Sequence, residues 1–99
     1  MSYLIIFHPK AEEEYKEAFA WYEKERIGLG SRFEEEVEQT LSRISSYPDA
    51  YGYSKGNYRE VNTNVFPYSI VYKVNNSKHT VYISAIYHNS RNPKNKYRK

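Results

Sequence analysis

The hydrophobic period changes once along this chain, and that change limits the folds open to it. Between about residues 10 and 44, apolar side chains recur every three or four residues, whereas between about residues 59 and 87 they alternate with polar ones. The first spacing predicts helices with one buried face, and the second predicts strands with one buried face. This succession predicts helices packed on one sheet.

The helical half is predicted to form a hairpin. The first helix runs from about residue 10 to 26 and follows Pro9, which suits a first helical turn. Glycines at 28 and 30 end it. Ser31 with Glu34 fits a capping box for the second helix, although this helix could begin a residue or two earlier. The two apolar stripes are Ala11, Tyr15, Ala18 and Tyr22 in the first helix, and Phe33, Val37, Leu41 and Ile44 in the second.

One short strand is expected before the hairpin and three after it. Residues 3–7 form an apolar run, predicted to be a strand buried on both faces or nearly so, and residues 45–57 contain proline and glycines typical of a loop. Pro67 cannot donate to a strand ladder, so it marks a strand start or a bulge. The alternating runs are residues 59–65, 68–74 and 81–87, and a turn over residues 74–79 joins the last two as an antiparallel hairpin.

Together these elements predict an α+β fold within a single domain, residues 1–99. The expected order is β-α-α-β-β-β, with a small, largely antiparallel sheet packed against the N-terminal helical hairpin. A chain of 99 residues can build one core and no second one. The twelve tyrosines help, because a tyrosine can fill a core with its ring and keep its hydroxyl in water.

Charge is divided unevenly between the two halves. Residues 1–50 carry six basic and eleven acidic side chains, and residues 51–99 carry nine basic and one acidic. A basic half of this kind indicates a face suited to a polyanion. The alternative is that the acidic and basic halves merely solubilise the outer faces of one molecule.

Several kinds of site and location are disfavoured by composition. The chain has no cysteine, so disulfides and thiolate metal sites are excluded, and His8, His79 and His88 lack metal-ligand spacing. No apolar run approaches the roughly 18–20 residues of a membrane span, and the N-terminal residues lack the features of a signal peptide. We therefore expect a cytoplasmic protein with no cofactor, no metal and no membrane partner.

Six segments, spread over most of the chain, form a series whose order and spacing are informative. Through this series the chain resembles the RelE/ParE family of bacterial type II toxins, with a pattern closer to the ParE-like members. The segments are FHPKAEEEYKEAFAWYE at 7–23, GLGSRFEEEVEQTL at 28–41, the loop with Pro48 and Tyr51, YREV at 58–61, FPYSIVYKV at 66–74 and ISAIYHNSRNP at 83–93.

The resemblance implies a toxin held inactive by a cognate antitoxin, and it leaves the target open. ParE-like members inhibit DNA gyrase and have no known nuclease site, whereas RelE-like members cleave mRNA in the ribosome. Ser69 falls where well-known cleaving members carry an arginine, and Val61 and Asn62 fall where they carry a lysine. The thinned basic cluster favours gyrase; the alternatives are a metal-independent endoribonuclease, and a protein of this fold that is no longer toxic.

If the chain cleaves RNA, the reaction needs a base for the 2′-hydroxyl, a cation for the pentacoordinate phosphate and an acid for the leaving oxygen. Cleaving members gather such groups on the concave sheet face and the C-terminal segment. The candidate catalytic residues here are His88, Arg91, Arg59 and Tyr97, which could converge on one face. His88 is expected beside Tyr82, Ser84 and Ile86 if Tyr87 points into the core.

Each candidate also has a plain structural explanation. His88 could cap its strand by bonding to the 91–92 region, Arg91 could pair with Glu60 or a helix carboxylate, and Arg59 could form a cross-strand pair. Trp21 is expected to pack against the sheet or the second helix. Residues 92–99 are either a flexible basic tail or an electrostatic extension of the site. The antitoxin is expected to cover the basic sheet face with an acidic and apolar segment.

Overall fold

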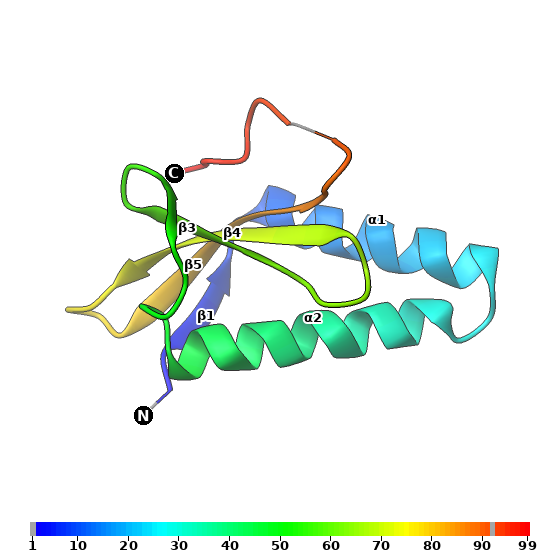
Figure 1. Cartoon of the computed structure of the whole chain (residues 1–99), viewed down its shortest axis with the longest axis horizontal. Helices are drawn as coiled ribbons and strands as arrows, with labels where there is room; N and C mark the ends of the chain where they lie inside the picture. Colours follow the sequence, from blue (N-terminus) through cyan, green and yellow to red (C-terminus); the bar gives the residue numbers. More distant parts are fainter. Residues whose placement is uncertain (1, 92) are drawn as a thin grey trace.

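The computed structural model describes residues 2–91 and 93–99, and it contains two helices and five strands in that part of the chain (Figure 1). The elements in chain order are β1 (Leu4–Phe7), α1 (Pro9–Glu25), α2 (Leu29–Ser46), β2 (Tyr53–Lys55), β3 (Tyr58–Asn62), β4 (Tyr68–Asn75) and β5 (Thr80–His88).

The five strands form one mixed sheet in the order β1-β5-β4-β3-β2. β1 runs parallel to β5, and the other three pairings are antiparallel. This confirms the predicted α+β fold, in which a largely antiparallel sheet packs against a helical hairpin. A parallel pairing needs a long crossover connection, and the helices and strands between β1 and β5 in the chain supply it.

The helical hairpin covers one face of the sheet and forms the core with it. Phe33, Val37 and Ile44 of α2 are fully buried, as are Ile70 and Tyr72 of β4 and Val81 and Ile83 of β5. Phe33 is central, since its ring packs against Tyr15, Tyr22, Phe66 and Tyr68. The stripes predicted from helical spacing are therefore the residues that build this core.

The turn between the helices differs from the predicted capping box. α2 begins at Leu29, after Gly28 in the left-handed region at φ +89°, so Ser31 is already inside the helix. The N-terminus of α2 is capped by Glu23 of α1, whose carboxylate accepts from Gly28 N at 2.9 Å and Gly30 N at 3.0 Å. Gly30 also lets the helices approach, because a Cβ there would lie 2.7 Å from the Phe19 carbonyl oxygen.

Three expectations from the sequence were wrong, two about the bounds of elements and one about burial. The segment 45–57 is not only a loop: α2 continues to Ser46, and residues 53–55 form the edge strand β2. β3 ends at Asn62 rather than continuing to residue 65, because the chain turns at Thr63, whose backbone N–H donates to the Tyr68 carbonyl and whose hydroxyl donates to the carbonyls of Phe66 and Tyr68. β1 is only half buried, since Leu4 and Ile6 lie exposed at the sheet edge.

An irregularity in β5 changes which residues face the helices. Tyr72 pairs with Ile83 while Val71 pairs with Ala85, so β5 has one extra residue at this point. A bulge of this kind shifts the alternation by one residue. Val81 and Ile83 face the core before the bulge, and Ile86 does so after it. Tyr87 therefore lies on the opposite face, and the expected grouping of His88 with Tyr82 and Ser84 was wrong.

The C-terminal segment returns across the sheet face that the helices leave uncovered (Figure 1). Ser84 of β5 donates to the Lys96 carbonyl at 2.7 Å and accepts from Arg98 N at 2.5 Å. Tyr58 and Tyr82 donate to the carbonyl oxygens of Arg98 and Lys99. We call residues 96–99 the strap. Neither described helix has the length and apolar character of a membrane span.

Candidate functional site

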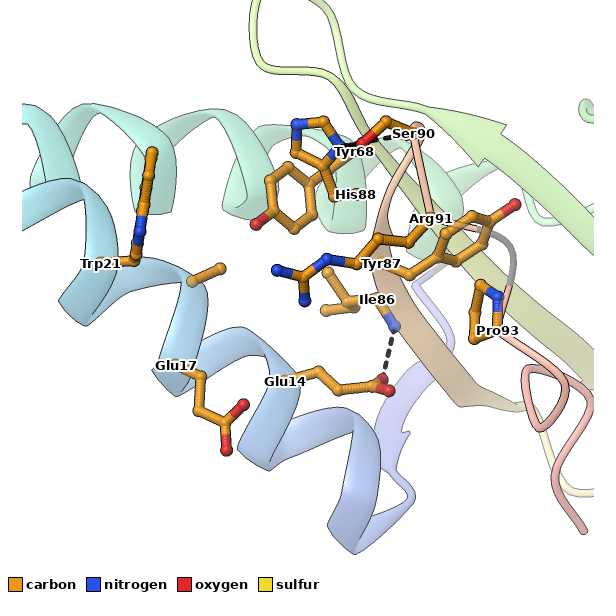
Figure 2. Close-up of a pocket in the computed structure, with 11 residues that line it drawn as sticks. Glu14, Glu17, Trp21, Tyr68, Ile86, Tyr87, His88, Ser90, Arg91 and Pro93 are labelled. Carbon is orange, nitrogen blue, oxygen red and sulfur yellow. Dashed lines mark hydrogen bonds between the residues drawn. The ribbon is translucent and has the colours of Figure 1, made fainter.

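A cleft of about 450 Å³ opens between α1 and the C-terminal end of β5, and we call it the α1/β5 cleft. Its floor is apolar and its rim is charged, with carboxylates on the α1 side and basic groups on the β5 side (Figure 2). The lining residues are Glu14, Glu17, Ala18 and Trp21 from α1, Tyr68 from β4, Ile86, Tyr87 and His88 from β5, and Ser90, Arg91 and Pro93.

His88 lies at this rim because the bulge places it on the helix side of β5. Its ring packs edge-on against Tyr68, with 5.3 Å between ring centroids. Its Nδ1 is 3.0 Å from Ser90 N and 2.7 Å from Ser90 Oγ. The backbone bond assigns Nδ1 as an acceptor, so His88 caps the turn that follows β5 and its Nε2 remains on the opposite side of the ring.

Arg91 and Trp21 are the prominent side chains of the cleft. Figure 2 shows the Arg91 guanidinium pointing from the turn after β5 toward α1. Trp21 is 57% exposed, so the expectation that it packs against the sheet or α2 was wrong; its neighbour Tyr22 takes that place in the core. An exposed tryptophan beside an arginine is typical of the residues that dominate binding at protein interfaces.

Glu14 joins the α1/β5 cleft to the strap. Its carboxylate accepts from Ile86 N at 3.0 Å, at a part of the β5 edge that β1 does not reach (Figure 2). The same carboxylate receives a bidentate pair from Arg98, at 3.1 and 2.9 Å. Arg98 also donates to the Ser84 carbonyl at 2.8 Å. A single carboxylate thus holds the helix, the strand edge and the strap together.

Arg59 makes its contacts outside the α1/β5 cleft, in the loop before β2. It donates to the Tyr51 carbonyl at 2.5 Å and pairs with Asp49 at 3.2 Å. Its guanidinium lies 4.0 Å from the centroid of the Tyr53 ring. Arg59 therefore fixes the loop that leads from α2 into β2. It does not line the α1/β5 cleft, and it does not contact the strap in the described part of the chain.

Tyr97 is in the strap, on the other sheet face from His88. Its hydroxyl lies 2.5 Å from Ser54 Oγ, and its ring packs against Tyr58 with centroids 5.3 Å apart. The neighbouring Lys96 is 3.6 Å from the Glu60 carboxylate and donates to the Tyr87 hydroxyl at 3.1 Å. That bond to Tyr87 raises the pKa of Lys96, while burial, and then a hydrogen bond to Glu60, raise the pKa of Tyr87.

The structure thus brings together two of the four candidate catalytic residues. His88 and Arg91 share the α1/β5 cleft, Arg59 belongs to the 49–53 loop, and Tyr97 to the strap. Sequence reasoning missed Trp21, Glu14, Glu60 and Lys96 as site residues. The side of the sheet on which His88 lies was mispredicted, because the bulge in β5 shifts the alternation of side chains by one residue. No sequence signal marks the pairing of Glu14 with Arg98, which are far apart in the chain.

Metal binding finds no support in the side-chain geometry. Within residues 2–91 and 93–99, no three histidine or carboxylate side chains are close enough to hold an ion. The α1/β5 cleft combines aromatic rings, a histidine, a guanidinium and the carboxylates of Glu14 and Glu17, a set that suits recognition of a partner surface.

Comparison with known proteins identifies the family. Residues 5–93 match the family model described as the ParE toxin of the type II toxin–antitoxin system parDE. No curated protein matches the chain in sequence.

Solved structures with the same fold include toxins alone and in complexes. The isolated Escherichia coli RelE toxin is 19% identical, with a TM-score of 0.68 over 92% of this chain and 88% of that one. The toxin–antitoxin complexes include the intact Escherichia coli RelBE complex (18% identity, TM-score 0.69, 91% and 100% covered) and RelBE2 from Mycobacterium tuberculosis (15%, 0.61, 89% and 99%). At these identities the likeness establishes the fold.

Proposed function

The chain belongs to the ParE toxin family of type II toxin–antitoxin systems, and from that premise we propose that it inhibits growth by binding DNA gyrase, as ParE-like members do. The observation that supports binding over RNA cleavage is the separation of the four candidate catalytic residues. Metal-free cleavage needs a base, a cation and an acid at one phosphate. Here Arg59 and Tyr97 make contacts remote from His88 and Arg91.

The pairing of basic side chains with carboxylates also supports binding over RNA cleavage. Lys96 and Arg98 lie on the sheet face where cleaving relatives gather their catalytic groups, and each is paired with a carboxylate, at 3.6 and 2.9 Å. A cation already neutralised by a carboxylate stabilises a developing phosphate charge less than a free one does. The face is suited to holding the strap, and the α1/β5 cleft is the surface we assign to the target.

A second candidate function, ribosome-dependent mRNA cleavage, is favoured by one observation. His88 and Arg91 line the same cleft, so an imidazole and a guanidinium face a common space (Figure 2). In that case His88 Nε2 would serve as acid or base, and Arg91 would bind the phosphate.

Both functions include a cognate antitoxin as partner. The similarity of the fold to toxins solved in RelBE complexes supports this proposal. Arg91 tests its contact surface better than Arg59, because Arg91 is exposed and Arg59 is held in the 49–53 loop. We expect Arg91→Glu to weaken the complex measurably by isothermal titration, and an unchanged affinity would place the antitoxin elsewhere.

Induction in cells separates the two functions. The wild type, a His88→Ala/Arg91→Ala variant and a matched Lys10→Ala/Lys16→Ala variant of α1 are compared for growth, mRNA 5′ ends and plasmid supercoiling. We expect altered supercoiling with intact mRNA in the wild type and in the α1 variant, and loss of toxicity in the cleft variant. New codon-positioned mRNA breaks that vanish in the cleft variant would instead establish cleavage.

A further inference from the structure

The basic side chains of residues 51–99 fall into two groups. Three of them pair with carboxylates: Arg59, Lys96 and Arg98. In the described part of the chain, the other six form no ion pair: Lys55, Lys73, Lys78, Arg91, Lys94 and Lys99. The unpaired positive charge therefore lies on more than one surface, with Arg91 in the α1/β5 cleft and Lys73, Lys78 and Lys99 elsewhere.

Three of these unpaired lysines line one cleft. It has a volume of about 640 Å³ and lies at the turn between β4 and β5, and we call it the hairpin cleft. Lys73, Lys78 and Lys99 contribute cations, and Asn57 and Asn76 add amide groups. Among the described residues, no Asp or Glu side chain lines this space. The side chains of this lining therefore attract anions, because they include three cations and no carboxylate.

Tyrosine rings lie beside two of the unpaired lysines, Lys73 and Lys55. Lys73 Nζ lies 5.3 Å from the ring centroid of Tyr58 and 5.7 Å from that of Tyr82. The Tyr58 ring packs against Tyr97, and Lys55 Nζ lies 5.5 Å from the Tyr97 centroid. A ring face positions an ammonium group without neutralising it. We call these five side chains the lysine–tyrosine stripe.

We propose that the lysine–tyrosine stripe and the hairpin cleft bind the phosphodiester backbone of duplex DNA. Unpaired ammonium groups can replace the counterions condensed on the phosphates, and this release supplies most of the affinity of backbone binding. The amides of the hairpin cleft can donate to phosphate oxygens. This surface is distinct from the α1/β5 cleft, so the inference does not depend on the proposed target.

The tyrosine rings favour a duplex over a single strand. Proteins that bind single strands offer free aromatic faces on which unpaired bases stack. Here Tyr58, Tyr82 and Tyr97 are partly buried, and each ring has a lysine ammonium near its face. A duplex needs no such stacking platform, because its bases are already stacked and its phosphates point outward.

The test is the salt dependence of DNA binding by the full chain. Fluorescence anisotropy of a labelled duplex gives the dissociation constant from low to physiological salt for the wild type, Lys73→Gln/Lys78→Gln and Lys10→Gln/Lys16→Gln. The control removes the same charge from α1, where each lysine pairs with a glutamate. Each phosphate contact contributes about −0.9 to the slope of log K against log salt, so Lys73→Gln/Lys78→Gln should lose nearly two units of slope. The control should keep the wild-type slope.

Several results would overturn the proposal. They are wild-type protein that does not bind at low salt, equal losses in the two double variants, and tighter binding of a single strand of the same sequence. The variant Lys78→Gln, altered at one exposed position only, keeps the test valid if the double variant unfolds. It should lose about one unit of slope.

Discussion

The two faces of the sheet are covered in different ways. The helix-covered face is closed by apolar side chains such as Phe33 and Ile70, which are fully buried. The strap-covered face is closed by hydrogen bonds and ion pairs, with Ser84, Glu60 and Glu14 as the main anchors. Burial of apolar area is cooperative and nondirectional, whereas a polar strap depends on a few directed bonds. The first face fixes the fold, and the second holds a basic segment that contains Lys96, Arg98 and Lys99.

The largest expected effect is the loss of a ring on the helix-covered face. Phe33→Ala removes the aromatic side chain that contacts Tyr22, Phe66 and Tyr68, so it should lower the free energy of unfolding by about 3–5 kcal/mol. Urea unfolding followed by circular dichroism measures this. The exposed Val65→Ala is the control, and it should stay within about 0.5 kcal/mol of the wild type. Equal losses would remove the distinction between core and surface.

Alkaline pH should weaken the helix-covered face through Tyr72. Burial raises the pKa of Tyr72 to about 12 from its ordinary value of 10.0. A raised pKa favours the protonated folded form, so this stability is complete below pH 10 and is lost as pH rises through about 12. The loss should be roughly 2 kcal/mol, measured by urea unfolding over this range. Tyr72→Phe should remove that part of the pH dependence, and a parallel loss in variant and wild type would contradict it.

On the strap-covered face, Arg98→Ala should cost less than the core variant. It breaks the bidentate pair with Glu14, at 3.1 and 2.9 Å, in a partly exposed setting, so we expect a loss of about 1–2 kcal/mol. The strap should also become more sensitive to proteases. Lys16→Ala is the control, because its pair with Glu12 is exposed at 3.7 Å and should contribute almost nothing. Indistinguishable unfolding curves for the two variants would mean that the strap is not anchored by Arg98.

The smallest effect on stability is expected at Trp21, which belongs neither to the core under the helices nor to the strap. Trp21→Ala should change the free energy of unfolding by no more than about 0.5 kcal/mol, because the side chain is mostly exposed. The toxicity of the Trp21→Ala variant on induction should fall at least tenfold, since an exposed tryptophan beside Arg91 fits a binding hot spot. The exposed Leu4→Ala tests whether any lost apolar side chain has the same effect. Unchanged toxicity of Trp21→Ala would separate the α1/β5 cleft from the target surface.

The same contrast explains what the sequence could predict. Apolar periodicity identified both helices, four of the five strands, the hairpin of the last two strands and the core around Phe33. Such periodicity is a local property of the sequence, since each buried face repeats at the spacing of its own helix or strand. The bulge in β5 has no comparable signal, so the side of His88 was misassigned. The Glu23 cap of α2 and the Glu14–Arg98 pair arise from tertiary contacts between residues of ordinary local pattern. Polar contacts of this kind depend on the tertiary structure, so they could not be predicted from the local sequence.

The most direct test of the central claim, that this toxin acts by binding gyrase without cleaving RNA, uses purified components. The protein is titrated into a DNA gyrase supercoiling reaction and, in parallel, into translating ribosomes with a defined mRNA. The expected result is loss of supercoiling with intact mRNA, and relief of inhibition in the His88→Ala/Arg91→Ala variant. Supercoiling that continues at high excess of toxin, together with cleaved mRNA, would contradict the account and assign His88 and Arg91 to catalysis.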